Sequence, residues 1–326
     1  MYHQYQIEYA PEGRPSAYYK DVSNGARKEI FAAKVRDIIQ HNSNSNTTWE
    51  KGLNEYSDMT DLEFTSYFNI VGDAQQCSAT HESAKNTVPL ELNLKDVPAH
   101  WDWRDFGVVT PVKNQGKCGS CWTFSTVGAM ESHFMKKYGQ FRNLSEQQLV
   151  DCADDFDNHG CNGGLPSHAF EYIMYAGGLA TEADYPYQAQ TLSCRLQPQM
   201  RSVGVLGGSY NISLSEDDMR NNLFMVGPVS IAFEVIAGFR DYKSGVYADP
   251  ACKKGPMDVN HAVLAVGYGT ENNVDYWVIK NSWGAAWGDN GYFKMLRNAN
   301  MCGVANCNSY PMDVIDLKPN SQAFLE

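Results

Sequence analysis

Apolar residues near the start of the chain recur at helical spacing. Between residues 21 and 68, steps of three and four positions predict one long amphipathic helix ending near His41, whose apolar face comprises Ile30, Phe31, Val35, Ile38 and Ile39. A second, short helix is expected from about Asp61 to Phe68. Residues 72–96 show no period and are rich in Gly, Gln, Ser, Thr and Pro, which is typical of a linker.

The pattern changes near Val97, where we place the start of the main domain, because glycine and aromatic residues become frequent from Trp101 onward. A largely buried helix from Cys121 to Tyr138, ended by Gly139, is predicted from the apolar residues on one face: Trp122, Phe124, Val127, Met130 and Phe134. Beyond residue 200, apolar runs separated by turns predict strands at 229–235, 262–268, 276–280 and 291–296. The main domain is therefore expected to have a helical first half and a β-rich second half.

Composition supports a globular protein and argues against some partners. Hydrophobic residues make up 43% and charged residues 20% of the 326 residues, as in ordinary soluble domains. The net charge is −12 and no run of Lys or Arg marks a basic face, so we expect no nucleic-acid partner. No apolar run is long enough to cross a membrane, and residues 1–20 lack the apolar centre of a signal peptide, which is compatible with a start downstream of a removed signal.

The chain has nine cysteines, which is an odd number. In an oxidising compartment this count suggests four disulfides and one unpaired thiol, whereas in the cytosol the same residues would suggest metal ligands. Sequons at Asn46, Asn143 and Asn211 favour the secretory route. Ser145 in the second sequon has another explanation, because Ser145 and Gln148 form a capping-box pattern that opens a helix.

The segment from Gln115 to Trp122, Gln-Gly-Lys-Cys-Gly-Ser-Cys-Trp, carries the strongest chemical signal. Cys121 would begin the predicted helix, where backbone N–H groups and the helix dipole favour a thiolate. The Cys121 N–H and the Gln115 amide could then donate to an oxyanion on an attacked carbonyl. A redox pair or half of a zinc site are alternatives for Cys118 and Cys121. The chain lacks the second close pair that zinc requires and the preceding βαβ unit typical of the redox motif.

A thiolate peptidase also requires a base, and His261 stands at the start of the strand Ala262–Val266. If this strand and the next form a hairpin in which facing positions sum to about 542, Asn281 lies beside His261 and can orient its ring. Trp283 is placed to shield that hydrogen bond from water. The pair Gly163 and Gly164 could be an ordinary turn or could present backbone groups to an extended substrate.

These motifs resemble the papain-like cysteine peptidases, and the resemblance extends from about residue 25 to 312. Within this family the chain is most similar to cathepsin H, through four segments: 121–126, 159–161, 164–167 and 260–269. The resemblance implies an α+β fold with a helical lobe, a β-barrel-like lobe and a cleft between them. It also implies acyl transfer at Cys121 without cofactor or metal, and a pocket for the second substrate residue lined by Leu165, Pro166 and Ala262.

The resemblance further implies how the cysteines pair. The expected disulfides are Cys118–Cys161, Cys152–Cys194, Cys252–Cys302 and Cys77–Cys307, which leaves Cys121 free. Residues 76–80, Gln-Cys-Ser-Ala-Thr, resemble the cathepsin H mini-chain, a retained piece of propeptide whose terminal carboxylate binds the substrate's free amino group. Cleavage after Thr80 and aminopeptidase activity are therefore implied. Alternatively, Cys77 only attaches the propeptide to the enzyme.

The N-terminal segment resembles the family's inhibitory propeptide through Arg27, Phe31, Ile38 and Asn42, and through a second motif at residues 52–58. It departs at two positions, with Ser23 where Glu is usual and Lys34 where Asn is usual. We expect this segment to run through the cleft against the substrate direction and to be loosened when acid protonates its carboxylates. The expected division is 1–72 propeptide, 73–80 mini-chain-like segment, 81–96 linker and 97–326 peptidase domain.

Taken together, the sequence predicts the inactive zymogen of a lysosomal-type cysteine peptidase that acts as an aminopeptidase like cathepsin H. An endopeptidase without a retained mini-chain and a catalytically silent binding relative are the alternatives. The expected partners are peptide and protein substrates, the chain's own propeptide and cystatin-type inhibitors, with no nucleic acid and no membrane. A monomer in the lysosome or vacuole, or in the secreted fraction, is expected.

Overall fold

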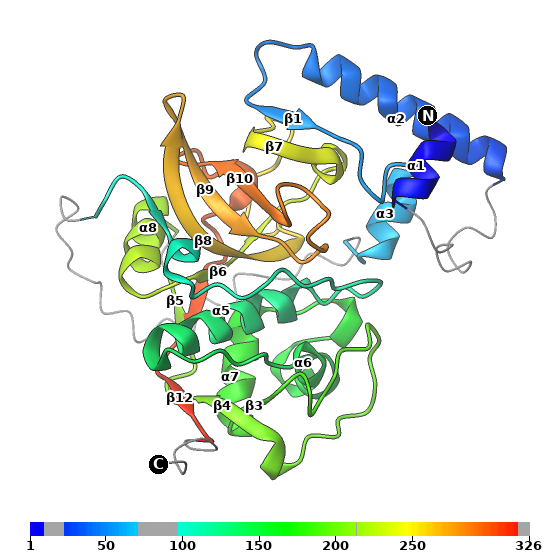
Figure 1. Ribbon diagram of the computed structural model, residues 1–326. Coiled ribbons are helices and arrows are strands. Elements are labelled where there is room, and N and C mark those ends of the chain that lie inside the picture. The colour runs from blue at the N-terminus through cyan, green and yellow to red at the C-terminus, as the bar shows by residue number, and fades with distance from the viewer. Residues whose placement is uncertain (10–22, 71–96, 213, 319–326) are drawn as a thin grey trace, which may run out of the picture.

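The computed structural model describes residues 1–9, 23–70, 97–212 and 214–318, which form two lobes and an N-terminal helical unit (Figure 1). One lobe is built from the helices α5 (Cys121–Tyr138), α6 (Glu146–Cys152) and α7 (Pro166–Ala176). A three-stranded sheet in the order β12 (Val314–Asp316), β4 (Arg201–Val205) and β3 (Leu179–Ala180) completes this lobe. The expected α+β fold is confirmed.

The predicted helix at Cys121 is confirmed at both ends. Gly139 adopts the left-handed conformation at φ 65° and donates its N–H to Met135, which ends α5. The predicted apolar face is buried in the lobe, with Trp122, Val127 and Phe134 completely covered. The start of α6 is also confirmed, because the Ser145 side chain accepts a hydrogen bond from the Gln148 N–H.

The other lobe is a nine-stranded sheet together with α8 (Glu216–Met225). Its path is β1 (Trp49–Lys51), β7 (Tyr242–Tyr247), β10 (Tyr292–Leu296), β9 (Val274–Lys280), β8 (His261–Glu271), β6 (Val229–Phe233), β11 (Ser309–Pro311) and β5 (Ser209–Asn211), with β2 (Trp101–Asp102) paired to β8. Among the described residues the end strands β1 and β5 do not pair with each other. The sheet therefore stays open, and the expected barrel-like lobe is not a closed barrel.

The hairpin of β8 and β9 corrects the predicted register. Its two-residue turn is Asn272–Asn273, and both residues have positive φ, which is typical of the tight turns that join twisted strands. Glu271 consequently faces Val274, and facing positions sum to 545 rather than about 542. A bulge between Ala265 and Gly267 then reduces the sum to 544, as in the pair Leu264 and Lys280.

The N-terminal unit consists of α1 (Tyr2–Tyr9), α2 (Asn24–Asn42) and α3 (Asp61–Tyr67), and its strand β1 extends the large sheet. Both predicted helices are present. Ser23, one of the two departures from the family motif, caps α2 by accepting a hydrogen bond from the Ala26 N–H. Lys34, the other departure, forms an ion pair of 2.6 Å with Asp241, whose side chain is completely buried.

Three of the four expected disulfides are present: Cys118–Cys161, Cys152–Cys194 and Cys252–Cys302. Cys77, Thr80 and the rest of the mini-chain-like segment lie outside the described residues. Of the sequon asparagines, Asn46 and Asn143 are exposed and Asn211 is buried. Across the described ranges, none of the helices combines the length and apolar character that crossing a bilayer demands.

Short 3₁₀ turns connect these elements at Trp103–Phe106, Asp154–Phe156, Gly160–Asn162, Pro198–Met200, Ala237–Asp241 and Met301–Gly303. Gly160–Asn162 leads into the glycine pair beside the cavity described below, and Ala237–Asp241 bonds the N-terminal unit through Arg240.

Candidate active site

Cys121 is the first residue of α5 and the one free thiol among the described cysteines. Its Sγ accepts a hydrogen bond of 3.4 Å from the N–H of Ala262 on β8, so the sulfur joins the two lobes. It lines a cavity of about 70 Å³ whose described walls also include Gly163, Gly164, Leu165, Pro166, Val259, His261, Ala262 and Cys307. The structure thus brings Cys121 together with most of the residues predicted to bind substrate.

His261 lies in the same cavity and is oriented by Asn281. Its Nε2 is 2.8 Å from Asn281 Oδ1, and because an amide oxygen only accepts, Nε2 carries the proton. His261 Nδ1 is buried without a hydrogen-bond partner, so it is the nitrogen available as a base. Asn281 Oδ1 also accepts the N–H of Ser282 at 2.8 Å, which fixes the direction of the amide.

Trp283 covers this pair from behind. Its ring lies 4.9 Å from the His261 ring at an interplanar angle of 29°, and the side chain is completely buried. Trp283 is not among the residues that line the cavity, so the structure gives it a place behind the histidine rather than against a substrate. Excluding water in this way strengthens the hydrogen bond between His261 and Asn281.

Gln115 is completely buried and held from several sides. Its Nε2 donates to the carbonyl of Cys118 at 2.9 Å, and its Oε1 accepts the hydroxyl of Ser282 at 2.7 Å. Because Ser282 donates to Oε1, the amide nitrogen is fixed on the side of the cysteine loop, where its second N–H can meet an oxyanion. Sequence reasoning identified Gln115 but missed Ser282, for which only its position after Asn281 was a signal.

Gly119 and Gly164 stand beside the sulfur at positions where the packing leaves no room for a side chain. A Cβ on Gly164 would lie 2.5 Å from the Trp122 ring and from Asn158 Oδ1, and one on Gly119 would lie 2.4 Å from the Cys161 carbonyl. Larger residues would therefore displace the backbone that forms the cavity wall.

Burial dominates the protonation of the pair in this form of the chain. Burial raises the pKa of the Cys121 thiol to about 11, although hydrogen bonds from the N–H groups of Ala262, Trp122 and Cys121 lower it. Burial also lowers the pKa of His261 to about 4, although its hydrogen bond to Asn281 raises it. In this form of the chain burial therefore disfavours the charged forms of both side chains, whereas the position at the start of the helix favours a thiolate.

The N-terminal unit packs against Trp283 and reaches the cavity that holds the pair. Phe68, just after α3, stacks on Trp283 at 4.9 Å, and Phe64 meets the same ring edge-on at 5.3 Å. The Asn69 side-chain amide donates to the Cys161 carbonyl at 3.0 Å, and Ile70 lines the cavity with Cys121. Asn69 and Ile70 of this unit therefore line the same cavity as Cys121 and His261.

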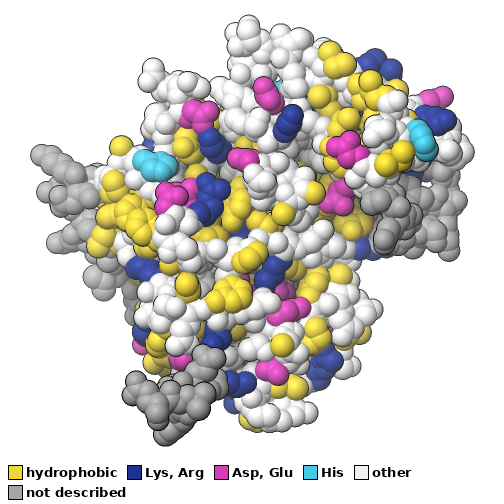
Figure 2. All heavy atoms as spheres, in the orientation of Figure 1, with side chains coloured by type: hydrophobic (Ala, Val, Ile, Leu, Met, Phe, Trp, Pro, Cys, Tyr) yellow, Lys and Arg dark blue, Asp and Glu magenta, His cyan; other side chains and the backbone are white. Residues whose placement is uncertain are grey.

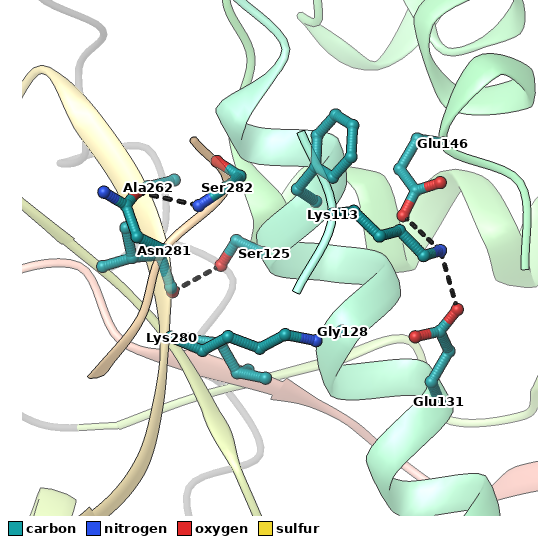
Figure 3. Close-up of a pocket in the computed structure, with 12 residues that line it drawn as sticks. Lys113, Ser125, Gly128, Glu131, Glu146, Ala262, Lys280, Asn281 and Ser282 are labelled. Carbon is teal, nitrogen blue, oxygen red and sulfur yellow. Dashed lines mark hydrogen bonds and ion pairs between the residues drawn. The ribbon is translucent and has the colours of Figure 1, made fainter. Parts of the chain in front are cut away.

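A second cavity, of about 20 Å³, lies between α5 and the strands β8 and β9 (Figure 3). Lys113 lies between the carboxylates of Glu131 at 2.9 Å and Glu146 at 2.7 Å, and Lys280 reaches toward α5 and donates to Thr110. Burial raises the pKa of Glu146 to about 7 and lowers that of Lys280 to about 8. Lys113 therefore pairs with two carboxylates of its own lobe, while Lys280 from the other lobe bonds the Thr110 hydroxyl, so we read this cavity as a structural polar cluster.

Charged side chains of both signs are scattered over the face shown in Figure 2 rather than gathered into one basic patch. A broad positive surface for a polyanion is therefore not present on that face.

Comparisons with known proteins agree with this geometry. Residues 97–312 match the papain family cysteine protease domain, and residues 3–64 match the cathepsin propeptide inhibitor domain. The chain is 52% identical to thiol protease aleurain of Arabidopsis thaliana, covering 88% of this chain and 78% of the relative. It is 48% identical to pro-cathepsin H of Mus musculus, covering 90% and 86%.

Solved structures show the same likeness. The digestive procathepsin L2 proteinase from the larval midgut of Tenebrio molitor superposes with a TM-score of 0.83 at 36% identity, covering 96% of this chain and 98% of the other. The recombinant stem bromelain precursor gives a TM-score of 0.82 at 33% identity, covering 95% and 97%.

Proposed function

Because the chain belongs to the papain family of cysteine proteases and is close to cathepsin H, we propose that it is an aminopeptidase that works through Cys121, His261 and Asn281. The observation that supports this most directly is the shared cavity: Cys121 and His261 both line it, and His261 has one nitrogen bound to Asn281 and the other without a hydrogen-bond partner. A base held in one tautomer next to a nucleophile is what acyl transfer requires.

The reaction follows from these positions. His261 Nδ1 takes the proton of Cys121, and the sulfur attacks the substrate carbonyl carbon. The Cys121 N–H, at the start of α5, and the Gln115 amide, which faces the loop before the helix, stabilise the oxyanion. The imidazolium then returns its proton to the leaving amine as the C–N bond breaks. Water, deprotonated by the same nitrogen, hydrolyses the thioester and regenerates the thiol.

Aminopeptidase specificity is supported by residues 76–80 and by the position of Cys307. The sequence Gln-Cys-Ser-Ala-Thr resembles the retained mini-chain of cathepsin H, and Cys307 lines the same cavity as Cys121. A peptide linked to Cys307 and ending at Thr80 would place a carboxylate within the substrate cleft. That charge would pair with a free amino terminus and would block longer substrates.

This specificity is tested with paired fluorogenic substrates that differ only in N-acetylation. A charge-assisted hydrogen bond contributes about 1.5–3 kcal/mol, so the free amine should be preferred by about 10- to 100-fold in kcat/KM. Mass spectrometry without reduction should find a peptide ending at Thr80 attached to the mature enzyme. A Cys77→Ser variant, which keeps every proposed catalytic group, should hydrolyse both substrates comparably. Equal hydrolysis by the unmutated enzyme would instead support the endopeptidase alternative.

We propose that residues 1–72 hold the chain inactive, followed by the mini-chain-like segment 73–80, a linker 81–96 and the peptidase domain 97–326. The N-terminal unit stacks on Trp283 and lines the cavity, and in this form of the chain burial disfavours the charged forms of Cys121 and His261. Lys34 contributes to this contact through its ion pair with buried Asp241. Lysine at this position, where the family usually has Asn, therefore adds an ion pair between the unit and the large sheet's lobe. Release of the unit would hydrate the site and favour the charged pair.

Acid should loosen the N-terminal unit through Glu63. Although burial raises its pKa, hydrogen bonds from Arg27 and from the Thr60 N–H lower it below the ordinary 4.5 overall. Because the pKa of Glu63 is lowered in the folded unit, its ionised carboxylate stabilises that unit at pH values above the ordinary pKa. This stabilisation is lost as pH falls through the lowered pKa. We therefore expect epoxide labelling of Cys121 in the full chain to be slow from pH 7 to 5 and to accelerate below about pH 4.5.

The matching variant is Glu63→Gln. Its Cys121 should be labelled by the epoxide faster at pH 6, and the labelling rate should depend less on pH than in the unmutated chain. Asp37→Asn is the control, because Asp37 pairs with Lys51 within the same unit but is half exposed. Identical pH profiles for the Glu63 variant and the unmutated chain would contradict this role.

The remaining properties follow from the family. We propose residence in the lysosome or vacuole or in the secreted fraction, inhibition by cystatin-type proteins, and a monomeric enzyme. Glycans are proposed at Asn46 and Asn143, whose side chains are exposed. A catalytically silent relative is the alternative from another class, and absence of epoxide labelling at Cys121 in the released enzyme would favour it.

A further inference from the structure

Gly164 lines the cavity that holds Cys121, and its backbone groups are not used within the protein. Among the described residues, neither its N–H nor its carbonyl has a hydrogen-bond partner. A residue with both groups free can exchange two hydrogen bonds with one residue of an extended chain, as in the closely spaced pairs of an antiparallel sheet. Binding of this kind requires that both groups point in a fixed direction.

Hydrogen bonds made by the two neighbours of Gly164 set that direction. The Gly163 carbonyl accepts the His159 N–H at 2.8 Å, and the Leu165 N–H donates to Asn158 Oδ1 at 2.7 Å. The peptide bonds on both sides of Gly164 are trans and planar, so the N–H and the carbonyl of each peptide group point in opposite directions. The Gly164 N–H therefore points away from His159, and the Gly164 carbonyl points away from Asn158.

Asn158 has little other reason to be polar. Its side chain is completely buried, and its Nδ2 has no hydrogen-bond partner, so the contact with the Leu165 N–H is what the amide provides. Burying an unpaired amide nitrogen opposes folding, and an apolar residue would avoid this cost. The amide oxygen also packs directly behind Gly164, where a Cβ would lie 2.5 Å from it. The side chain is therefore explained better by the orientation of this backbone than by stability.

We propose that Asn158 is a positioning residue for substrate binding. By holding the Leu165 N–H, it aims the Gly164 carbonyl at a backbone N–H of an extended chain in the cleft. The partner is the second substrate residue, because Leu165 also lines the pocket expected for that residue's side chain. This role rests on the proposed function, in which Cys121 attacks a bound peptide. Asn158 itself is not among the residues that line the cavity.

The test uses the processed Cys77→Ser enzyme, in which no retained peptide can be linked to Cys307 and occupy the cleft. Two blocked dipeptide fluorogenic substrates are compared, which differ only in whether the second residue carries its backbone N–H or an ester oxygen in that place. One neutral hydrogen bond predicts a preference for the N–H of about 3- to 10-fold in kcat/KM. Asn158→Leu should reduce this preference to less than about twofold, by lowering kcat/KM for the N–H substrate.

Two further measurements separate positioning from general damage. Alkylation of Cys121 by iodoacetamide, which is too small to need Gly164, should change less than about twofold in Asn158→Leu. Asn158→Asp is the conservative variant, because a carboxyl oxygen can still accept the Leu165 N–H, and it should keep the preference for the N–H substrate.

Gln148→Leu is the matched control. Gln148 is completely buried in the same lobe and its Oε1 accepts the Ala180 N–H at 2.7 Å, but it does not line the cavity. Its replacement should lower the melting temperature and leave the substrate preference unchanged.

An unchanged preference in Asn158→Leu, or an equal loss of preference in Gln148→Leu, would overturn the inference. The absence of any preference with Asn158 in place would overturn it as well. Should Asn158→Leu not fold, Asn158→Ala gives the same comparison. If the Cys77→Ser enzyme with Asn158 intact hydrolysed neither substrate and its Cys121 resisted alkylation, the proposed function would fail, and this role with it.

Discussion

Replacing Cys121 with serine is expected to lower kcat/KM of the processed enzyme by roughly 10⁴-fold or more, as for removal of a nucleophile in other acyl-transfer enzymes. The surroundings of this residue suit a sulfur anion and not an alkoxide. The first turn of α5 and the Ala262 N–H supply partial positive charge, but the histidine is oriented by the neutral amide of Asn281 rather than by a carboxylate. A hydroxyl, whose proton is far harder to remove than that of a thiol, would stay unreactive.

The measurement compares kcat/KM of Cys121→Ser with that of the unmutated enzyme after processing by an added protease. Serine is nearly isosteric with cysteine and can accept the same N–H, so the melting temperature should change little. Epoxide labelling should disappear together with activity. Retention of more than about one percent of the activity would show that another group is the nucleophile.

Replacing His261 with glutamine is expected to have the second largest effect, a loss of roughly 10³- to 10⁴-fold in kcat. A glutamine amide can still donate to Asn281 Oδ1, so the hydrogen bond at 2.8 Å can be kept. It has no nitrogen that can take the Cys121 proton or return one to the leaving amine. The variant therefore removes the proton transfer while sparing much of the packing against Trp283.

His133→Gln provides a matched control for this experiment. Burial lowers the pKa of His133 to about 4, the same value as for His261, and its Nε2 lies 3.0 Å from the Pro228 carbonyl. His133 is on α5 but lines a separate cavity with Lys136 and Tyr310. Its replacement should cost about 1 kcal/mol of stability and leave kcat/KM within about threefold. Equal losses in both variants would mean that the effect at position 261 is structural.

The helix at Cys121 was predictable because its signals are local. The apolar face and Gly139 are all contained within residues 121–139, and each acts through neighbours one or two turns away. Helix α8 was missed because its sequence is mainly polar, with only Met219 and Leu223 as deeply buried apolar residues. Its one local signal was Ser215, which caps the helix by accepting from the Asp218 N–H.

The hairpin of β8 and β9 shows how far strand register can be predicted from the spacing of residues in the sequence. Apolar runs predicted β8 and β9, but the register was wrong because the turn lies at Asn272–Asn273, later in the chain than a sum of about 542 requires, and the bulge between Ala265 and Gly267 corrects the sum by only one. Asn272–Asn273 was an available signal for the turn, since asparagine tolerates positive φ. His261 and Asn281 still meet, through side chains that reach diagonally across the strands.

By itself the sequence determined the family and the residues of the proposed reaction, because a cysteine opening a helix, a histidine opening a strand and an amide after the next strand are short patterns with few other uses. Tertiary structure alone decided how deeply that pair is buried and which partners hold it. Ser282 meets Gln115 across 167 positions, and aromatic residues of the N-terminal unit cover Trp283. Desolvation and contacts of this kind depend on which distant segments pack together, and no local pattern records that.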